Sequence, residues 1–294
     1  MTGTIPNFLI LGAMKAGTSS LYKYLAQHPQ VFMSADKEPQ FFALGEMEVA
    51  PGRMSPVTPR ITGNWEQYLR HFDGWRGQPA VGEASTSSLH IERAAGRIHE
   101  RLPEAKLIAV LRHPADRAYS NWLFLRKLCV DSIADFQQAL EAEPHRDIYA
   151  TKTLQYRMKG LYHQHLSRYY ALFPASQIRV YLYEDLRDRP LEMIRDICRF
   201  LEIDDAFTPD MSIRYNVSGE PRNGFVTSCL KAARPARRWI ERHVPPRFLG
   251  PVRDAVLTRP GLDPDLRRRL TSDYRHDILQ LQDLIQRDLT HWLK

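Results

Sequence analysis

The sequence is poor in cysteine and lacks any long apolar segment. Its 294 residues include three cysteines (Cys129, Cys198 and Cys229), and their spacing matches neither a disulfide framework nor a metal-binding motif. So low a content indicates a reducing compartment. No apolar run approaches the ~20 residues that cross a bilayer. The opening MTGTIPNFLIL lacks the basic region and cleavage site of a secretory signal. These absences predict a cytoplasmic protein with no transmembrane segment.

The rest of the composition is that of a globular protein with a basic balance. Hydrophobic residues make up 43% of the chain and charged residues 26%. The net charge of +7 favours anionic partners, which include nucleic acid, membrane surfaces and phosphorylated cofactors. The sequence has no internal repeat and no low-complexity tract, and its length suits one large domain. We therefore expect a single domain over residues 1–294.

Three short runs are predicted to be strands: NFLIL (7–11), KLIAVL (106–111) and IRVYLY (178–183). Their apolar or β-rich character is typical of strands buried in a parallel sheet. Each run precedes a polar turn and then a helical pattern. This alternation predicts an α/β fold with a central, mostly parallel β-sheet flanked by helices.

The helical patterns are most distinct after the first and third strands. Leu21, Tyr24, Leu25 and His28 share one predicted helical face after the first strand. After the third, Asp188 and Pro190 predict a helix start. An apolar stripe follows on that helix: Leu191, Ile194, Cys198 and Leu201.

Two segments depart from the regular alternation. Residues 45–64 are rich in Pro and Gly and are predicted to form a loop or lid. Residues 225–294 are expected to be a mostly helical C-terminal elaboration, with the strongest helical pattern at 266–293. Within it, residues 231–253 carry seven Lys/Arg against one Glu and contain four prolines. We expect that stretch to be a solvated face, with contact to an anionic acceptor, a membrane surface or a partner subunit as the alternatives.

The segment GAMKAGTSS (12–20) is similar to a phosphate-binding loop. Gly12 and Gly17 have the separation found in a Walker motif, but Thr18 stands where its lysine belongs, and Lys15 lies inside the loop. Glycines let the backbone approach an anion, and amides at the start of the following helix point toward it. Three hydroxyl donors follow, from Thr18, Ser19 and Ser20. We therefore predict a P-loop-like domain, although a glycine turn with a solvated lysine would have the same sequence.

A second motif, LIAVLRHPADRAYSNWLF (107–124), suits a separate phosphate. Arg112 ends the strand, and Ser120 follows eight residues later inside the next helix. The planar guanidinium of arginine binds two phosphate oxygens at once. Ordinary ATP needs no such second site, whereas an adenosine with both a 5′ and a 3′ phosphate does.

With these motifs the chain resembles the sulfotransferases that use 3′-phosphoadenosine 5′-phosphosulfate (PAPS). The resemblance is to the carbohydrate-type branch, which includes heparan sulfate sulfotransferases and bacterial relatives. GAMKAGTSSLYKYLAQHP matches the 5′-phosphosulfate loop, and LRHPADRAYSNW matches the 3′-phosphate motif. KEPQFF and VGEASTSSL match two further family segments. YLYEDL, RYNVSGEPRNG and LQDLIQRDLTHWL fall where the family has its late strand, its cofactor-covering loop and its C-terminal segment.

The resemblance implies a set of donor-binding residues. Around the 5′-phosphosulfate it implies Lys15, Ala16, Gly17, Thr18, Ser19 and Ser20. For the 3′-phosphate it implies Arg112 and Ser120, with Arg222, Asn223 and Gly224 closing over the same group. Trp122 is expected either beside the adenine or in the core. Family members are metal-independent, so no metal is expected.

The resemblance also implies two catalytic residues. Lys15 would stabilise the leaving oxygen of the nucleotide, and Glu38, in the matching KE-x-x-FF segment, would be the general base. A surface carboxylate paired with Lys37 is the alternative for Glu38. His113 is expected to shape the turn after Arg112.

The acceptor side carries the weakest signals. VGEASTSSL retains Glu83 but has Ala84 and then Ser85 where glycan enzymes have a lysine and a TPxY segment. Glu83 is predicted either to shape the site or to be a strand-end partner. Tyr162 and His163 are predicted to contact the acceptor or to pack as a helical stripe. We expect a bacterial enzyme acting on a saccharide, lipid or secondary metabolite, and the sequence does not determine its oligomeric state.

Two other functions fit parts of the sequence. A nucleotide or nucleoside kinase would share the sheet and the anion loop, but it would need a Walker lysine and a carboxylate that holds Mg²⁺. A non-enzymatic anion-binding protein would explain the basic stretch but not two phosphate motifs on α/β turns. The sequence has no RNA-binding signature, and no nucleic-acid partner is expected.

Overall fold

Five parallel strands form the central sheet of the computed structural model, which describes residues 4–45, 63–128, 130–145, 154–212, 220–221, 257–258 and 261–294. The strands are β1 (Phe8–Gly12), β2 (Val31–Met33), β3 (Ala80–Ala84), β4 (Lys106–Leu111) and β5 (Ile178–Leu182). They lie in the order β2-β3-β1-β4-β5, and each adjacent pair is parallel. A short antiparallel pair is separate from this sheet, formed by β6 (Glu220–Pro221) and β7 (Leu257–Thr258). The predicted α/β fold is confirmed.

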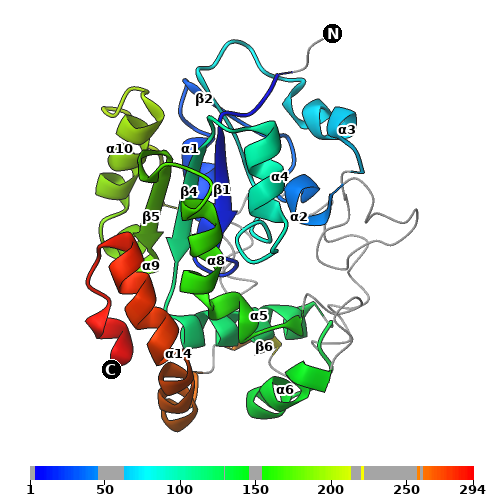
Figure 1. Ribbon diagram of the computed structural model, residues 1–294, viewed down its shortest axis with the longest axis vertical. Coiled ribbons are helices and arrows are strands. Elements are labelled where there is room, and N and C mark those ends of the chain that lie inside the picture. Colours follow the sequence, from blue (N-terminus) through cyan, green and yellow to red (C-terminus); the bar gives the residue numbers. More distant parts are fainter. Residues whose placement is uncertain are drawn as a thin grey trace.

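Helices flank the sheet, as Figure 1 shows. In that view α4 and α8 cross in front of the strands, and α1 lies behind them. The α-helices are α1 (Thr18–Leu25), α2 (Phe41–Leu44), α3 (Trp65–Leu69), α4 (Ala94–Arg101), α5 (Pro114–Lys127), α6 (Phe136–Ala142), α8 (Tyr162–Tyr170), α9 (Tyr183–Asp188), α10 (Pro190–Leu201) and α14 (Pro264–Ile285). The short 3-10 helices are η1 (Arg70–Phe72), η2 (Glu143–His145), η4 (Met158–Gly160), η5 (Ala175–Gln177) and η6 (Thr290–Leu293). None of the helices in the described ranges combines the length and apolarity needed to cross a bilayer.

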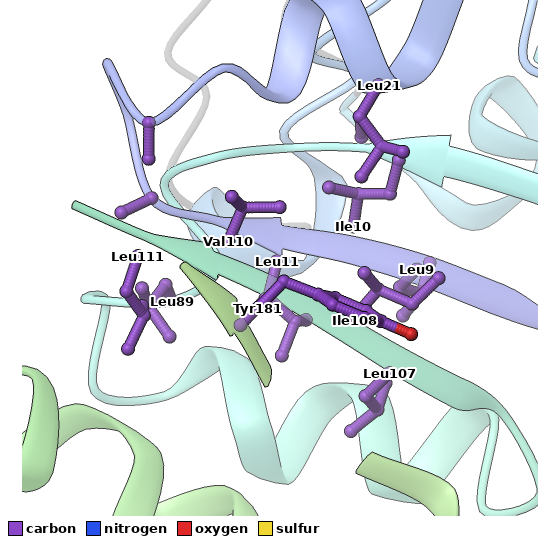
Figure 2. Close-up of a cluster of buried hydrophobic side chains, with 14 of the residues drawn as sticks. Leu9, Ile10, Leu11, Leu21, Leu89, Leu107, Ile108, Val110, Leu111 and Tyr181 are labelled. Atoms are coloured by element: carbon purple, nitrogen blue, oxygen red, sulfur yellow. The ribbon is translucent and has the colours of Figure 1, made fainter. Parts of the chain in front are cut away.

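The two central strands carry the most deeply buried side chains. Residues 8–11 of β1 and 107–111 of β4 are at most 1% exposed. Figure 2 shows Leu21 of α1 directed toward Ile10 from one side of the sheet, with Leu89 on the other side. A strand covered on both faces must be apolar at every position, not at every second one. This is why both strands have continuous apolar sequences.

The carboxyl ends of all five strands lie at one edge of the sheet because the strands are parallel. The segments that leave this edge are 13–17 after β1, 34–40 after β2, 85–93 after β3, 112–113 after β4, and the start of α9 after β5. Ligands of open parallel sheets bind outside this edge. The two predicted phosphate motifs both begin here.

The C-terminal helix α14 packs against α8 and α5. Its Tyr274 lies so close to Gly160 that a Cβ atom there would be 2.9 Å from the tyrosine Cε1. Arg267 of α14 forms an ion pair of 3.0 Å with Asp116 of α5. The helix predicted over 266–293 is too long, because Gln286 adopts a left-handed φ of 51° that ends α14, and only the short η6 follows.

The helix predicted after the first strand is also too long, because it included His28. Helix α1 stops at Leu25, and His28 lies in the turn beyond it, 2% exposed. Its Nε2 contacts the Asp204 carbonyl at 2.8 Å, and its Nδ1 accepts the N–H of Gln30. His28 therefore links the end of α1 to the segment after α10.

Helix α10 begins at the predicted Pro190, while Asp188 is the last residue of the preceding α9. Three members of the predicted apolar stripe are buried in α10: Ile194, Cys198 and Leu201. The proposed lid at 45–64 lies almost wholly outside the described residues, and the basic stretch at 231–253 lies entirely outside them. Within 225–294, residues 264–285 are helical as predicted.

Candidate active site

The loop between β1 and α1 depends on two glycines with positive φ. Gly12 has a φ of 153°, and a Cβ there would lie 2.9 Å from Leu89 Cβ. Gly17 is the N-cap of α1 with a φ of 93°, and a Cβ there would lie 2.4 Å from Leu186 Cδ2. Only glycine tolerates both the conformation and the close contact. The loop therefore brings the first turn of α1, which begins at Thr18, to the sheet edge.

Lys15 lies inside this loop and is held in a cationic environment. Its backbone has a left-handed φ of 72°, and its ammonium lies 4.4 Å from the ring centre of Phe124. The pKa of Lys15 is lowered from 10.5 to about 7, chiefly by burial and also by the nearby charges of Lys127, Arg112 and Lys37. A bound anion would reverse this effect, since an opposite charge favours the protonated amine.

Arg112 directly follows β4, as predicted, and lies beside the loop. Its guanidinium stacks 5.0 Å from the ring centre of Tyr183, and its Nη1 donates a long hydrogen bond of 3.4 Å to the Lys15 carbonyl. Ser120 lies in α5, as predicted, and is 4% exposed. The structure thus brings Arg112 to the loop that carries Lys15, although 97 residues separate them in the sequence.

Glu38 follows β2, and its carboxylate accepts four hydrogen bonds. Lys37 Nζ and the Thr86 hydroxyl bond Oε1 at 2.6 Å and 2.9 Å. Gln40 Nε2 and the Thr86 backbone N–H bond Oε2 at 2.7 Å and 2.8 Å. The pairing with Lys37 that we considered as an alternative is present. It coexists with a fixed position at the sheet edge, where the side chain is 19% exposed.

Two left-handed residues shape the turn that carries this carboxylate. Glu38 has a φ of 66° and Gln40 a φ of 63°. The Glu38 N–H donates to the Ala84 carbonyl at 2.9 Å, and the Gln40 N–H donates to Ser85 Oγ at 2.9 Å. The end of β3 therefore holds the turn. Non-glycine residues with positive φ concentrate at functional sites.

Glu83 is buried beneath this turn on β3. It is 2% exposed, and Ser85 Oγ donates to its Oε2 at 2.7 Å. The pKa of Glu83 is raised from 4.5 to about 8, chiefly by burial and also by the charge of Glu38, while the hydrogen bond from Ser85 opposes the rise. Glu83 thus holds Ser85, which in turn holds Gln40.

The other predicted residues lie farther from the open edge. Tyr162 is fully buried, and its hydroxyl donates to the Arg112 carbonyl at 2.8 Å. His163 is half-buried at the start of α8, with its backbone N–H bonded to Asp277. Trp122 packs in the core with its indole N–H on the Ile133 carbonyl. These contacts make Tyr162 a support for Arg112.

His113 supports the turn after β4, and three predicted donor residues lie beyond the described part of the chain. His113 is buried at the start of α5, and its Nε2 contacts the Trp292 carbonyl at 2.9 Å, so it joins the turn to the C-terminal segment. Arg222, Asn223 and Gly224 lie outside the described residues. The described part of the chain contains no group of three or more His, Cys, Asp or Glu side chains placed to hold a metal ion.

Sequence reasoning missed three contributors to the site: Gln40, Thr86 and Lys127. The run of hydroxyl residues from Ser85 to Ser88 was a usable signal for Thr86, because hydroxyls after a strand are ready partners for a carboxylate. No local pattern marks Lys127, whose effect on Lys15 arises only in the folded chain.

Comparison with known proteins identifies relatives over most of the chain. Residues 6–214 match the family model described as the sulfotransferase domain. A solved sulfotransferase from Alicyclobacillus acidocaldarius is 30% identical, with a TM-score of 0.74, and the match covers 99% of this chain and 100% of that one.

The curated relatives include two bifunctional heparan sulfate N-deacetylase/N-sulfotransferases. Enzyme 4 of Mus musculus is 26% identical and enzyme 2 of Homo sapiens 28% identical, and each match covers 99% of this chain. The chain spans 31% of the length of these curated relatives.

Proposed function

The chain belongs to the sulfotransferase family, and from this premise we propose that it transfers a sulfuryl group from PAPS to an acceptor hydroxyl, or less readily an amine. The observation that carries the proposal is the contact between Arg112 and the loop of Lys15. Two separate cationic positions at one sheet edge suit a nucleotide with phosphates at both ends of its ribose.

The residues present fit this donor. The charged groups that act on the Lys15 ammonium are cations, and together with burial they lower its pKa to about 7. Such a concentration of positive charge suits the binding of an anion. The glycine-supported loop and the first turn of α1 offer amides and hydroxyls to the 5′-phosphosulfate. Arg112, stacked on Tyr183, and Ser120 would hold the 3′-phosphate.

Transfer needs an in-line arrangement, a base and a stabilised leaving group. PAPS supplies the sulfuryl group. Glu38 accepts the acceptor proton as the acceptor oxygen bonds to sulfur. The bond between sulfur and the bridging oxygen breaks, and its electron pair stays on the 5′-phosphate of 3′-phosphoadenosine 5′-phosphate (PAP). Lys15 stabilises the charge that develops on that oxygen.

For the acceptor we propose a saccharide, lipid or secondary metabolite in the cytoplasm of a bacterium. The named relatives act on heparan sulfate nitrogen, so an amine acceptor belongs in the screen. Ala84 and the hydroxyl residues after it differ from the glycan enzymes, which favours a different acceptor. Glu83 and His163 remain proposed contributors on the acceptor side.

The donor is tested by calorimetric titration with PAP, AMP and ATP–Mg²⁺. We expect PAP to bind most tightly of the three. Arg112→Ala should weaken PAP binding about 10- to 100-fold and leave AMP binding nearly unchanged, because a charge-assisted contact is worth about 1.5–3 kcal/mol. Arg70→Ala, an exposed arginine paired with Glu66, is the matched control. Preference for ATP–Mg²⁺, or equal losses for PAP and AMP, would contradict the proposal.

The base is tested with Glu38→Gln. We expect PAP affinity within about 3-fold of wild type and turnover of PAPS reduced about 10²- to 10⁴-fold, the usual contribution of a general base. Full turnover in this variant would remove Glu38 from the mechanism.

A further inference from the structure

Lys127 occupies the last turn of α5, on the side of the helix that faces the Lys15 loop. Ser120, Phe124 and Lys127 follow the spacing i, i+4, i+7, which places them along one helical face. Phe124 of this row touches the Lys15 ammonium through its ring. Lys127 is half-buried one turn beyond it.

The charge of Lys127 also acts on Lys15. Lys127 is the charged group that lowers the pKa of Lys15 most, ahead of Arg112 at the end of β4 and Lys37 after β2. These three cations come from different segments and all disfavour the charged form of Lys15, whose ammonium contacts the Phe124 ring. Like charges held together in a poorly solvated site destabilise the empty protein, and a bound anion removes that repulsion.

Lys127 is too far along α5 to share the 3′-phosphate with Ser120. At 1.5 Å of rise per residue, the offset of seven positions between them spans about 10 Å. The 3′-phosphate pair, Arg112 and Ser120, belongs to the first half of the helix. Lys127 belongs to the half that faces Lys15, the residue assigned to the 5′ end of the donor.

We propose that Lys127 is a further catalytic residue, whose ammonium binds the sulfuryl oxygens of the donor. The assignment rests on the proposed function. During transfer, sulfur exchanges its bond to the bridging oxygen for a bond to the acceptor, and the broken bond's electron pair stays on PAP. Lys15 contacts the oxygen that departs. Lys127 contacts the three oxygens that move with sulfur, and it gives up no proton.

A binding comparison tests this assignment without any acceptor. PAP and PAPS differ only in the sulfuryl group, so their affinities are compared for wild type, Lys127→Met and Lys127→Arg. We expect Lys127→Met to weaken PAPS binding about 10-fold and PAP binding less than about 3-fold, because only PAPS has the sulfuryl group that contacts Lys127. Lys127→Arg retains the charge and should keep most of the PAPS affinity. Lys23→Met, an exposed lysine of α1, controls for net charge.

Proton uptake gives a second readout. PAP binding is measured calorimetrically at pH 8 in two buffers of different ionisation enthalpy. Lys15, with a pKa near 7, is mostly neutral in the free wild type and takes up a proton when the phosphate binds. In Lys127→Met, loss of a neighbouring cation raises the pKa of Lys15, so we expect smaller uptake.

The outcomes separate the two proposals. Equal losses of PAP and PAPS affinity in Lys127→Met would assign Lys127 to the 5′-phosphate and overturn the sulfuryl contact. Unchanged affinities and unchanged proton uptake would remove Lys127 from the site while leaving the proposed function intact. A wild-type protein that binds neither PAP nor PAPS would overturn both. Thermal unfolding of each variant verifies that it is folded.

Discussion

Thr86 holds both oxygens of Glu38, its backbone N–H at 2.8 Å from Oε2 and its hydroxyl at 2.9 Å from Oε1. The two residues are 48 positions apart and lie at the ends of neighbouring strands. We propose Glu38 as the general base, and a carboxylate that is held from two directions has a defined orientation. Thr86 is therefore a positioning residue for Glu38.

Removing the hydroxyl of Thr86 should lower turnover and spare binding. For Thr86→Val we expect PAPS turnover, with water as acceptor and PAP release as the signal, to fall about 3- to 10-fold, since one hydrogen bond is worth about 1 kcal/mol. PAP affinity should stay unchanged. Thr86→Ser keeps the hydroxyl and should keep the rate. A Val variant with full turnover, or one that loses PAP affinity, contradicts the positioning role.

Glu83 should make stability fall as pH rises. Its pKa is raised from 4.5 to about 8 in the folded protein, chiefly by burial. Between these two values the folded state holds a proton that the unfolded state has released, so each pH unit removes up to about 1.4 kcal/mol of stability. The contribution is complete below pH 4.5 and is lost as pH passes 8.

The test compares wild type with Glu83→Gln by denaturant unfolding at pH 5 and at pH 8. Glutamine cannot ionise, so the variant should gain stability relative to wild type at the higher pH. Parallel pH profiles for the two proteins would show that Glu83 does not titrate between these values.

The charge of Lys15 should lower the stability of the folded protein, although the same charge supports donor binding. Its pKa is about 7 in the folded protein against 10.5 for a free lysine, so wild-type stability should rise as pH increases from 7 to 10.5. Lys15→Met should be more stable than wild type at pH 6, by about 1 kcal/mol or more, and the difference should shrink toward pH 10.

The measurement for Lys15→Met is the melting temperature at pH 6 and pH 9, with and without PAP. We expect PAP to stabilise wild type and to have little effect on the variant. Lys23→Met, the exposed control, should respond to PAP as wild type does. A Lys15 variant that is less stable than wild type at pH 6 would contradict the electrostatic account.

Arg287 should stabilise the segment that carries Tyr183. Its two terminal nitrogens bond Asp185 at 2.6 Å each, and Asp185 also accepts the Leu182 N–H at the start of α9. We expect Arg287→Ala to cost about 1–3 kcal/mol of unfolding free energy, since it breaks a bidentate, partly buried pair. It should also weaken PAP a few-fold, because Tyr183 stacks on Arg112.

The matched control for this variant is Arg268→Ala. Arg268 pairs with Asp265 on the exposed face of α14, and such pairs contribute about 0–1 kcal/mol. Denaturant unfolding and PAP titration of both variants give the comparison. Equal effects of the two substitutions would mean that the Asp185 pair has no special role.

Local sequence predicted the parts of this protein that depend on neighbours in the chain. The continuous apolar runs of β1 and β4 identified strands buried on both faces, and Pro190 marked the start of α10. The loop glycines and Arg112 were identified because they and their neighbours in the sequence form recognisable phosphate-binding motifs. The ends of α1 and α14 were predicted too late in the sequence. Their termination at Leu25 and Ile285 depends on tertiary contacts and on backbone conformation.

The sequence by itself determined the α/β class, the family resemblance and the residue types of the proposed donor site. Only the tertiary structure decided which side chains meet at the sheet edge. It brought Thr86 to Glu38, Ser85 to Gln40, and Arg112 to Lys15, from segments far apart in the chain. The physical reason is that burial and electrostatic coupling depend on distance in space, and parallel strand order sets those distances.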